Sequence, residues 1–239
     1  MNQLPSELQP ALDTFTAALT ATLGEDLECL AVYGPVAAGD YVTDYTPVNV
    51  LIVPRAVTLS VLRQVVAPLR EARRICRLVP FIMTRGDLIA SSDVFPIKFR
   101  MMKECHVLLA GVDVLEDVLV ADTHLRLRCE QELKNLVLRL RLRYLEAQGD
   151  VGRLRNVAIM TSQAAIDPLR VTVSLKSGKV PDRAQLVSAA REHCGLDLSP
   201  LDELKKVLRA SKPAMNDLES AYDTLMNTIE AAARYADSL

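Results

Sequence analysis

Two short stretches within the first 60 residues decide which fold the sequence predicts. The first reads YGPVAAGD over residues 33–40, and the second reads TPVNVLIV over residues 46–53. The first stretch closes a short apolar run at 29–33, and the second is itself apolar from residue 48. Short apolar runs bounded by Gly, Pro, Asp and Thr are typical of β-strands. The sequence therefore predicts two strands joined by a glycine-containing loop.

The elements around these strands alternate between helix and strand. Helical spacing of apolar residues predicts helices over 5–23 and 58–74, although Pro68 should kink the second or end it early. Residues 78–83 predict a third strand, and Pro80 within it favours an edge or a bulge. A short helix over 95–102 and a fourth strand over 106–110 follow.

After about residue 118 the pattern becomes purely helical. A long helix is predicted over 123–148, followed by helices over 154–166, 182–194, 200–210 and 214–236. We expect Leu138, Leu142 and Leu145 to widen the buried stripe of the long helix. The β-branched run 171–175 is ambiguous, but Asp167 and Pro168 have the form of an N-cap followed by proline at the first helical position, so a helix is predicted there.

Strands mixed with helices, followed by helices alone, predict an α+β chain of two domains. The first is a small mixed-sheet domain over residues 1–118, and the second is an all-α helical bundle over residues 119–239. Two domains also suit the length of 239 residues.

The overall composition excludes several classes of protein. With 50% hydrophobic and 24% charged residues, the chain is too apolar to be disordered. A formal net charge of -2 gives no electrostatic reason to expect nucleic acid or anionic lipid as a partner. The chain has six Tyr, four Phe and no Trp, so it lacks the aromatic platforms on which single-stranded nucleic acids stack. We therefore do not expect nucleic acid to bind.

The cysteines and the N-terminus indicate the cellular compartment in which the protein is expected. Five cysteines without any C-x-x-C spacing predict reduced, mostly buried thiols and neither a disulfide framework nor a zinc site. The N-terminus has no basic region of the kind that begins a signal peptide, and no apolar run approaches the roughly 18 residues of a membrane span. A cytoplasmic protein without a membrane segment is expected.

The pattern of the two opening stretches resembles the signature of the nucleotidyltransferase superfamily, whose fold is that of DNA polymerase β. In that superfamily a strand leads into G-S-x-A-x-G-D, and S-D-I-D-L-x-V lies on the next strand. Gly34, Ala37, Gly39 and Asp40 stand at the matching positions. The resemblance implies a nucleotidyltransferase-like domain of the aminoglycoside adenylyltransferase or minimal type.

The resemblance also implies how such a site works. Two Asp side chains at alternate positions of one strand share a face and hold the metal ions that bridge the triphosphate and the attacking hydroxyl. The Gly-Ser turn offers backbone N–H groups and a hydroxyl to the phosphates. The residues that line the corresponding pocket in this sequence are Gly34, Pro35, Gly39, Asp40, Thr46 and Asn49.

Several of these positions depart from the superfamily's chemistry. Pro35 replaces the serine and removes both a hydroxyl and a backbone donor. Pro47 and Asn49 replace the two aspartates, and neither is a good ligand for a hard divalent cation. A third carboxylate is expected on the strand 78–83, which contains none. The sequence therefore predicts no metal and no other cofactor.

A downstream stretch extends the resemblance. The segment FPIKF at 95–99, followed by VLLAG at 107–111, is similar to the F-P-[IL]-E-F and V-L-x-G of a bacterial branch of nucleotidyltransferase-like proteins. CEQEL at 129–133 is similar to the start of that branch's helical region. Lys98 occupies a position that is usually acidic.

Other candidate groups have simpler interpretations. Asp40 and Asp44 are four residues apart and could form a displaced metal site, but Asp in a loop more often serves the turn. His106 and His124 have no paired carboxylate or nucleophile in register, so a packing or surface role is favoured. No Ser-His-Asp order, P-loop or HExxH motif is present.

Three functions remain open. The first is a degenerate, non-catalytic nucleotidyltransferase-like protein that binds a nucleotide or another phosphorylated ligand. The second is an active transferase of nucleoside monophosphate groups that uses Mg²⁺ at a rearranged site, with Asp40 and Asp44 as ligands. The third is an interaction protein that binds a partner or a second copy through its helical half.

Overall fold

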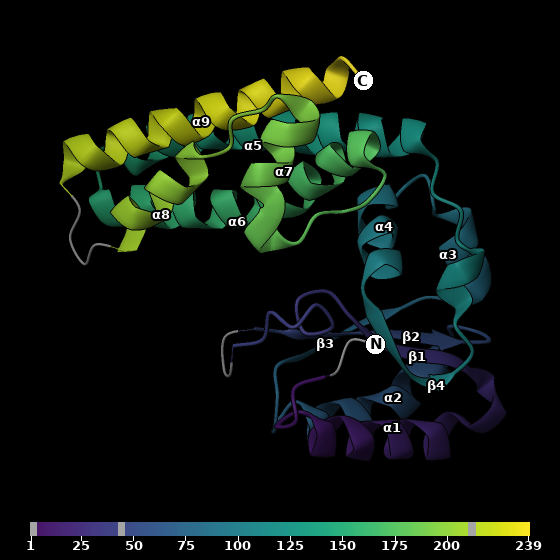
Figure 1. The fold of residues 1–239 in the computed structure, drawn as a ribbon. Helices are drawn as coiled ribbons and strands as arrows, with labels where there is room; N and C mark the ends of the chain where they lie inside the picture. The colour runs from purple at the N-terminus through teal and green to yellow at the C-terminus, as the bar shows by residue number, and fades with distance from the viewer. Residues whose placement is uncertain (1–3, 43–45, 210–213) are drawn as a thin grey trace. The chain divides into compact units, whose positions relative to one another are not determined.

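The chain folds as two compact units, Met1–Val120 and Ala121–Leu239, referred to below as the N-terminal unit and the helical unit. The computed structural model describes residues 4–42, 46–209 and 214–239. All four described strands belong to the N-terminal unit, and the described elements of the helical unit are all helices (Figure 1). The predicted α+β class is confirmed.

The N-terminal unit is built on a four-stranded mixed sheet in the order β3-β2-β1-β4. Strand β1 pairs antiparallel with both β2 and β4, whereas β2 and β3 run parallel. The strands are β1 Leu27–Tyr33, β2 Val48–Pro54, β3 Leu78–Ile82 and β4 His106–Gly111. The sequence predicts all four, and Pro80 does lie on an edge strand, where its missing N–H interrupts no central ladder.

Helices cover both faces of this sheet. Because neighbouring residues of a strand point to opposite faces, Val50 and Ile52 of β2 enter one core while Leu51 and Val53 enter another. Figure 1 shows α1 and α2 below the sheet and α3 and α4 on its other side. These helices are α1 Gln9–Leu23, α2 Leu59–Ala72, α3 Arg85–Ala90 and α4 Pro96–Glu104.

Two helices of the N-terminal unit differ from expectation. Helix α2 continues past Pro68 to Ala72, so the early end predicted for it is wrong. The proline ring is buried, and this packing offsets the helical hydrogen bond that proline cannot donate. The short helix α3 is not predicted, because it has only six residues. A capping box formed by Thr84 and Asp87 defines its start.

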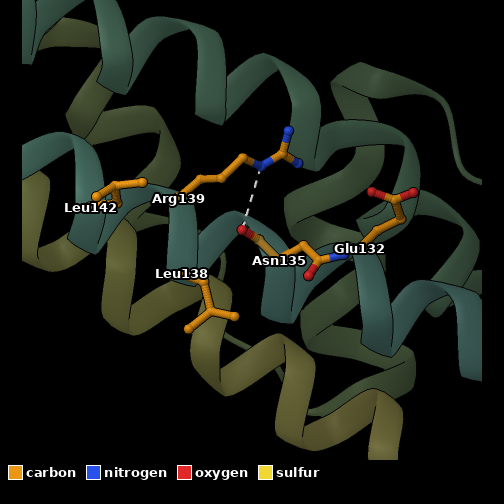
Figure 2. Close-up of a pocket in the computed structure, with 5 residues that line it drawn as sticks. All are labelled: Glu132, Asn135, Leu138, Arg139 and Leu142. Atoms are coloured by element: carbon orange, nitrogen blue, oxygen red, sulfur yellow. Dashed lines mark hydrogen bonds between the residues drawn. The ribbon is translucent and has the colours of Figure 1, made fainter.

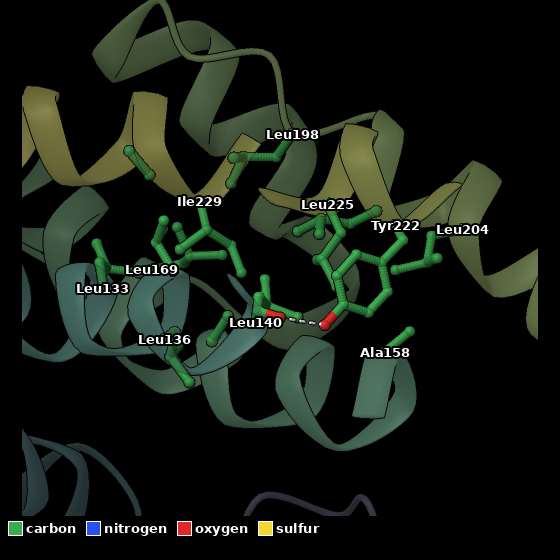
Figure 3. Packing of buried hydrophobic residues seen from close by; sticks show 14 of the residues in the cluster. Leu133, Leu136, Leu140, Ala158, Leu169, Leu198, Leu204, Tyr222, Leu225 and Ile229 are labelled. Carbon is green, nitrogen blue, oxygen red and sulfur yellow. Dashed lines mark hydrogen bonds between the residues drawn. The ribbon is translucent and has the colours of Figure 1, made fainter. Parts of the chain in front are cut away.

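The helical unit surrounds a single apolar core. Its long helices are α5 Asp122–Ala147, α6 Val151–Ser177 and α9 Met215–Asp237, and its short ones are α7 Leu186–Cys194 and α8 Pro200–Arg209. Figure 3 shows Leu136, Leu169 and Ile229 among the side chains that fill this core. The Tyr222 hydroxyl donates a buried hydrogen bond of 2.6 Å to the carbonyl oxygen of Leu140, which ties α9 to α5.

Helix α6 corrects one predicted boundary. The helical assignment of residues 171–175 is confirmed, but Asp167 and Pro168 do not start a helix, because α6 runs through them from Val151 to Ser177. Pro168 is buried within the helix, and the hydroxyl of Thr172 donates to its carbonyl oxygen at 2.8 Å. Asp167 pairs with Arg170 at 3.7 Å instead of capping. Burial against the bundle therefore outweighs the local proline signal.

Helix α5 corrects a second expectation. Leu138, Leu142 and Leu145 were expected to widen the buried stripe, but their exposed fractions are 58%, 54% and 72%. Figure 2 shows Leu138 and Leu142 beside Glu132, Asn135 and Arg139, around a shallow hollow on the helix surface. The buried side chains of α5 form a narrower stripe that runs from Leu125 to Leu140 and ends at Ala147, because α6 and α9 cover one side of α5.

Three of the five cysteines, Cys29, Cys76 and Cys129, are buried, and none of the five forms a disulfide. In the part of the chain that the structure describes, no helix combines the length and apolar character needed to cross a membrane.

Candidate functional site

A compact turn follows β1 at the position of the nucleotidyltransferase-like motif. Several of its backbone N–H groups form hydrogen bonds within the turn. The N–H of Ala38 donates to the carbonyl oxygen of Gly34 at 3.0 Å, and the N–H of Asp40 donates to the carbonyl oxygen of Pro35 at 2.8 Å. The N–H of Gly39 donates to Val36 at 3.3 Å. Gly34 has a φ of 77°, in the left-handed region that favours glycine. The turn is thus buried at Val36 and Ala37 and exposed from Ala38 to Asp40.

Asn49 lies directly against this turn. The Nδ2 atom of its side chain is 3.2 Å from the point where a β-carbon on Gly34 would stand. Asn49 is half-buried at the start of β2 and is in register with Tyr33 of β1 and Val79 of β3. The structure therefore brings together Gly34 and Asn49, two of the residues expected to line the pocket.

The remaining pocket candidates lie in the loop between β1 and β2. The Thr46 hydroxyl accepts a hydrogen bond from the N–H of Val42 at 2.9 Å and lies 3.5 Å from the carbonyl oxygen of Asp40. Asp40 is exposed, and Pro35 is partly buried. Asp44, the second ligand of the hypothetical displaced metal site, lies outside the described residues. Thr46 thus organises the loop by bonding its backbone.

One row of residues crosses the sheet beside the turn. It runs from Val79 through Asn49 and Tyr33 to His106, one residue from each strand. Residues in register share a face, so the row lies on the side covered by α4. Burial raises the pKa of the Tyr33 phenol to about 12, which keeps it neutral at ordinary pH. The row offers amide, phenol and imidazole groups without a carboxylate.

These residues do not fit a divalent cation. Mg²⁺ requires oxygen ligands and prefers carboxylates, but Pro47 and Asn49 occupy the two carboxylate positions of the motif. The third position would lie on β3, where Val79 and Phe81 share the face of Asn49. Among the residues that the structure describes, no three His, Cys, Asp or Glu side chains cluster in a way that could hold a metal ion.

A lysine occupies the space above β3. The Nζ atom of Lys98, on α4, lies 3.6 Å from the centroid of the Phe81 ring. Phe81 also packs against Phe99, with ring centroids 6.5 Å apart. Desolvation lowers the pKa of Lys98 below its ordinary value. Sequence reasoning noted Lys98 only as a departure from an acidic position and missed its contact with Phe81, which depends on how α4 packs over the sheet.

His106 corrects a further expectation, because it does have a carboxylate partner. Its Nε2 atom lies 2.8 Å from Oδ2 of Asp113, and its Nδ1 atom lies 2.9 Å from the carbonyl oxygen of Met102. The other oxygen of Asp113 accepts from the N–H of Leu115 at 3.0 Å. The pair joins the start of β4 to the short 3-10 helix at Val114–Asp117. A role in packing, which the sequence favoured, agrees with this geometry.

The sheet, the turn and the helices together define a nucleotidyltransferase-like fold, as the motif predicts. The chain is similar to a solved structure of spectinomycin adenyltransferase AAD(9) from Enterococcus faecialis with ATP and spectinomycin, with a TM-score of 0.57 and 12% sequence identity. The match covers 93% of this chain and 99% of that one. No family model and no curated protein matches the sequence.

Proposed function

We propose that the N-terminal unit binds a nucleotide or another phosphorylated ligand without a divalent metal and does not transfer nucleotidyl groups. The observation that carries this proposal is the sheet face around Asn49. Pro47 and Asn49 stand where the motif has two metal-binding carboxylates. On β3, where a third carboxylate would lie, the residues on this face are Val79 and Phe81. In the turn beside this face, Gly34 and Gly39 have positive φ angles, and the lack of a side chain at both positions leaves room for a ligand to approach the backbone.

The loss of the carboxylates affects catalysis more than binding. Nucleotidyl transfer needs metal ions to bridge the triphosphate and activate the attacking hydroxyl. Binding needs only donors and positive charge placed near the phosphates, which backbone N–H groups, an Asn amide and a lysine can supply. A binding protein built on this fold is therefore the function that the residues favour.

A thermal unfolding scan against a panel of nucleotides, each with Mg²⁺ and with EDTA, tests the proposal. A ligand at 100 times its Kd stabilises the native state by about 2.7 kcal/mol, which shifts the Tm visibly. We expect stabilisation that is unchanged by EDTA, and no nucleotidyl transfer. Stabilisation only with Mg²⁺, or tight binding of Mg²⁺ by the unmodified protein, would contradict the proposal.

A matched variant strengthens this test. In P47D/N49D, two carboxylates return to alternate positions at the start of β2, where side chains share a face. We expect this variant to gain Mg²⁺-dependent stabilisation that the wild type lacks. The alternative, an active enzyme that uses Asp40 and Asp44, predicts that Asp40→Ala and Asp44→Ala abolish transfer. Transfer unchanged in both would exclude that arrangement.

The exposed leucines of α5 favour a second candidate function, self-association through the helical unit. Leu138, Leu142 and Leu145 follow one another at helical spacing and are each more than half exposed. Contiguous apolar surface of this kind is typical of protein contacts. Sedimentation velocity should show a dimer that Leu142→Glu disrupts, and a concentration-independent monomer would exclude this candidate.

A further inference from the structure

Among the described residues, Lys98 is a half-buried cation that no ion pair joins to an Asp or Glu. Its Nζ atom lies over the ring of Phe81. Lysine is seldom removed from water unless its charge is compensated. The face of one aromatic ring compensates it only in part. The site therefore holds positive charge that no carboxylate of the described residues neutralises.

The position of the Lys98 ammonium relative to Asn49 indicates what it could bind. Phe81 is in register with Leu51, two residues along β2 from Asn49, so Phe81 and Asn49 lie on the same face of adjacent strands. With strands about 4.8 Å apart and a rise of about 3.3 Å per residue, the backbones of these two residues lie about 8 Å apart. Lys98 stands over this face from α4. Its ammonium thus lies on the part of the sheet where the fold's metal-binding carboxylates are replaced.

We propose that the Lys98 ammonium supplies the positive charge that divalent metal ions supply in related folds, and that it binds a phosphate group of the ligand directly. This inference rests on the proposed metal-independent binding. The Asn49 amide, beside the glycine turn, donates to the same ligand. Phe81 holds the lysine stem in place, and the ligand's phosphate provides the missing counter-charge.

The single positive charge of Lys98 also indicates how many phosphate groups the ligand carries. A single ammonium neutralises far less charge than a pair of divalent cations. The further phosphate charge of a triphosphate would have to lose water without a partner, which costs free energy, so a triphosphate is poorly matched to this site. The site suits a nucleotide with one or two phosphate groups. We therefore expect ADP or AMP to bind more tightly than ATP in the absence of metal.

Lysine variants of the full chain test the inference by isothermal titration calorimetry with ADP in EDTA. Lys98→Met keeps the apolar stem over Phe81 and removes the charge, so we expect affinity to fall about ten- to hundredfold, as for the loss of one charged hydrogen bond. Lys98→Arg keeps the charge and the ring contact, and its affinity should stay within about threefold of wild type.

Lys103 provides a matched control on the same helix. Its Nζ atom donates to the carbonyl oxygens of Val118 at 2.7 Å and Glu116 at 3.4 Å, so Lys103→Met makes the same charge change at a structural position. We expect this variant to lose stability and keep its affinity for ADP. Lys98→Met should keep its stability, since it removes a desolvated charge, and this shows that its lost affinity is not caused by unfolding.

The outcomes separate this inference from the proposed function. Equal affinity of wild type and Lys98→Met for ADP in EDTA would overturn the role of Lys98 while leaving metal-independent binding intact. Tighter binding of ATP than of ADP in EDTA would overturn the assignment of ligand class. Wild type that binds no nucleotide without Mg²⁺ would overturn the proposed function itself, and the inference with it.

Discussion

The side-chain amide nitrogen of Asn49 lies 3.2 Å from the point that a β-carbon on Gly34 would occupy. This distance is shorter than an ordinary van der Waals contact between a methyl group and a nitrogen. Because Gly34 also has a φ of 77°, a side chain there meets both backbone strain and a steric contact.

Gly34→Ala should therefore destabilise the N-terminal unit by more than the backbone strain alone, which costs about 1–2 kcal/mol. Gly39→Ala is the matched control in the same turn, because its φ is 83° but no neighbouring atom of the described residues lies within 4 Å of its β-carbon position. In an Asn49→Ala background the cost of Gly34→Ala should approach that of Gly39→Ala. Denaturant unfolding followed by circular dichroism measures all four variants, and an unchanged cost in that background would argue against the contact.

The hydroxyl of Tyr222 makes a buried hydrogen bond of 2.6 Å to the carbonyl of Leu140. Tyr222→Phe should cost about 1 kcal/mol, since it removes one hydrogen bond and keeps the ring. Tyr144→Phe is the control, because the Tyr144 hydroxyl bonds Glu219 at an exposed position and its loss should change little. Chemical unfolding of both variants measures the difference between their free energies of unfolding. Equal losses of stability would contradict the expectation that the buried hydrogen bond contributes more than the exposed one.

Arg170 is an arginine only 7% exposed, and its Nε atom donates to the carbonyl of Pro181 at 2.7 Å. Arg170→Met should destabilise the helical unit by about 2 kcal/mol, as for the loss of a hydrogen bond made by a charged group. Asp167→Asn should cost less than about 0.5 kcal/mol, because the ion pair at 3.7 Å involves an exposed carboxylate. Thermal unfolding compares them, and a larger loss from Asp167→Asn would reverse this ranking.

The stability of the helical unit should fall at alkaline pH because of Cys129. Burial raises the pKa of this thiol to about 12, above its ordinary value of 9.0. Between these values the unfolded chain releases a proton that the folded chain keeps, so stability is fully present below about pH 9 and is lost as pH rises toward 12. The slope is at most about 1.4 kcal/mol per pH unit.

Cys129→Ala tests this linkage, because alanine removes the titrating group. We expect the variant to be less stable at pH 7, where a buried side chain is truncated, and to lose less stability between pH 9 and pH 11 than wild type. Urea unfolding at several pH values measures both effects. If the free energies of unfolding of the two proteins fell equally with rising pH, Cys129 would not contribute to the loss of stability.

Much of the fold could be predicted because its signals are local. Each predicted strand is a short apolar run bounded by glycine, proline or polar residues, and burial of both sheet faces keeps β1 and β2 apolar along most of their length. The glycine turn is also a local signal, since Gly34 supplies a backbone conformation that other residues resist. The pocket candidates Gly34 and Asn49 came from the same motif, and the structure places the Asn49 amide where a side chain on Gly34 would stand.

The features that the sequence predicted wrongly depend on contacts between residues of different elements. Leu138, Leu142 and Leu145 have the hydropathy of core residues, and only the placement of α6 and α9 leaves them exposed. Pro168 has the local form of a helix start, which burial in the bundle overrides. Asp113 is seven residues from His106, beyond the end of β4, so no periodic pattern signals their pairing.

The sequence by itself determined the strands, the helical half and the glycine turn, because residue type and short-range spacing decide these features. It also placed Pro47 and Asn49 where the resemblance implies carboxylates. Only the tertiary structure decided which side chains share the sheet face with Asn49. Strand register places Phe81 there, and the packing of α4 brings Lys98 to within 3.6 Å of its ring. Periodicity reports which residues are buried, whereas the partner of a buried charge depends on how separate elements pack.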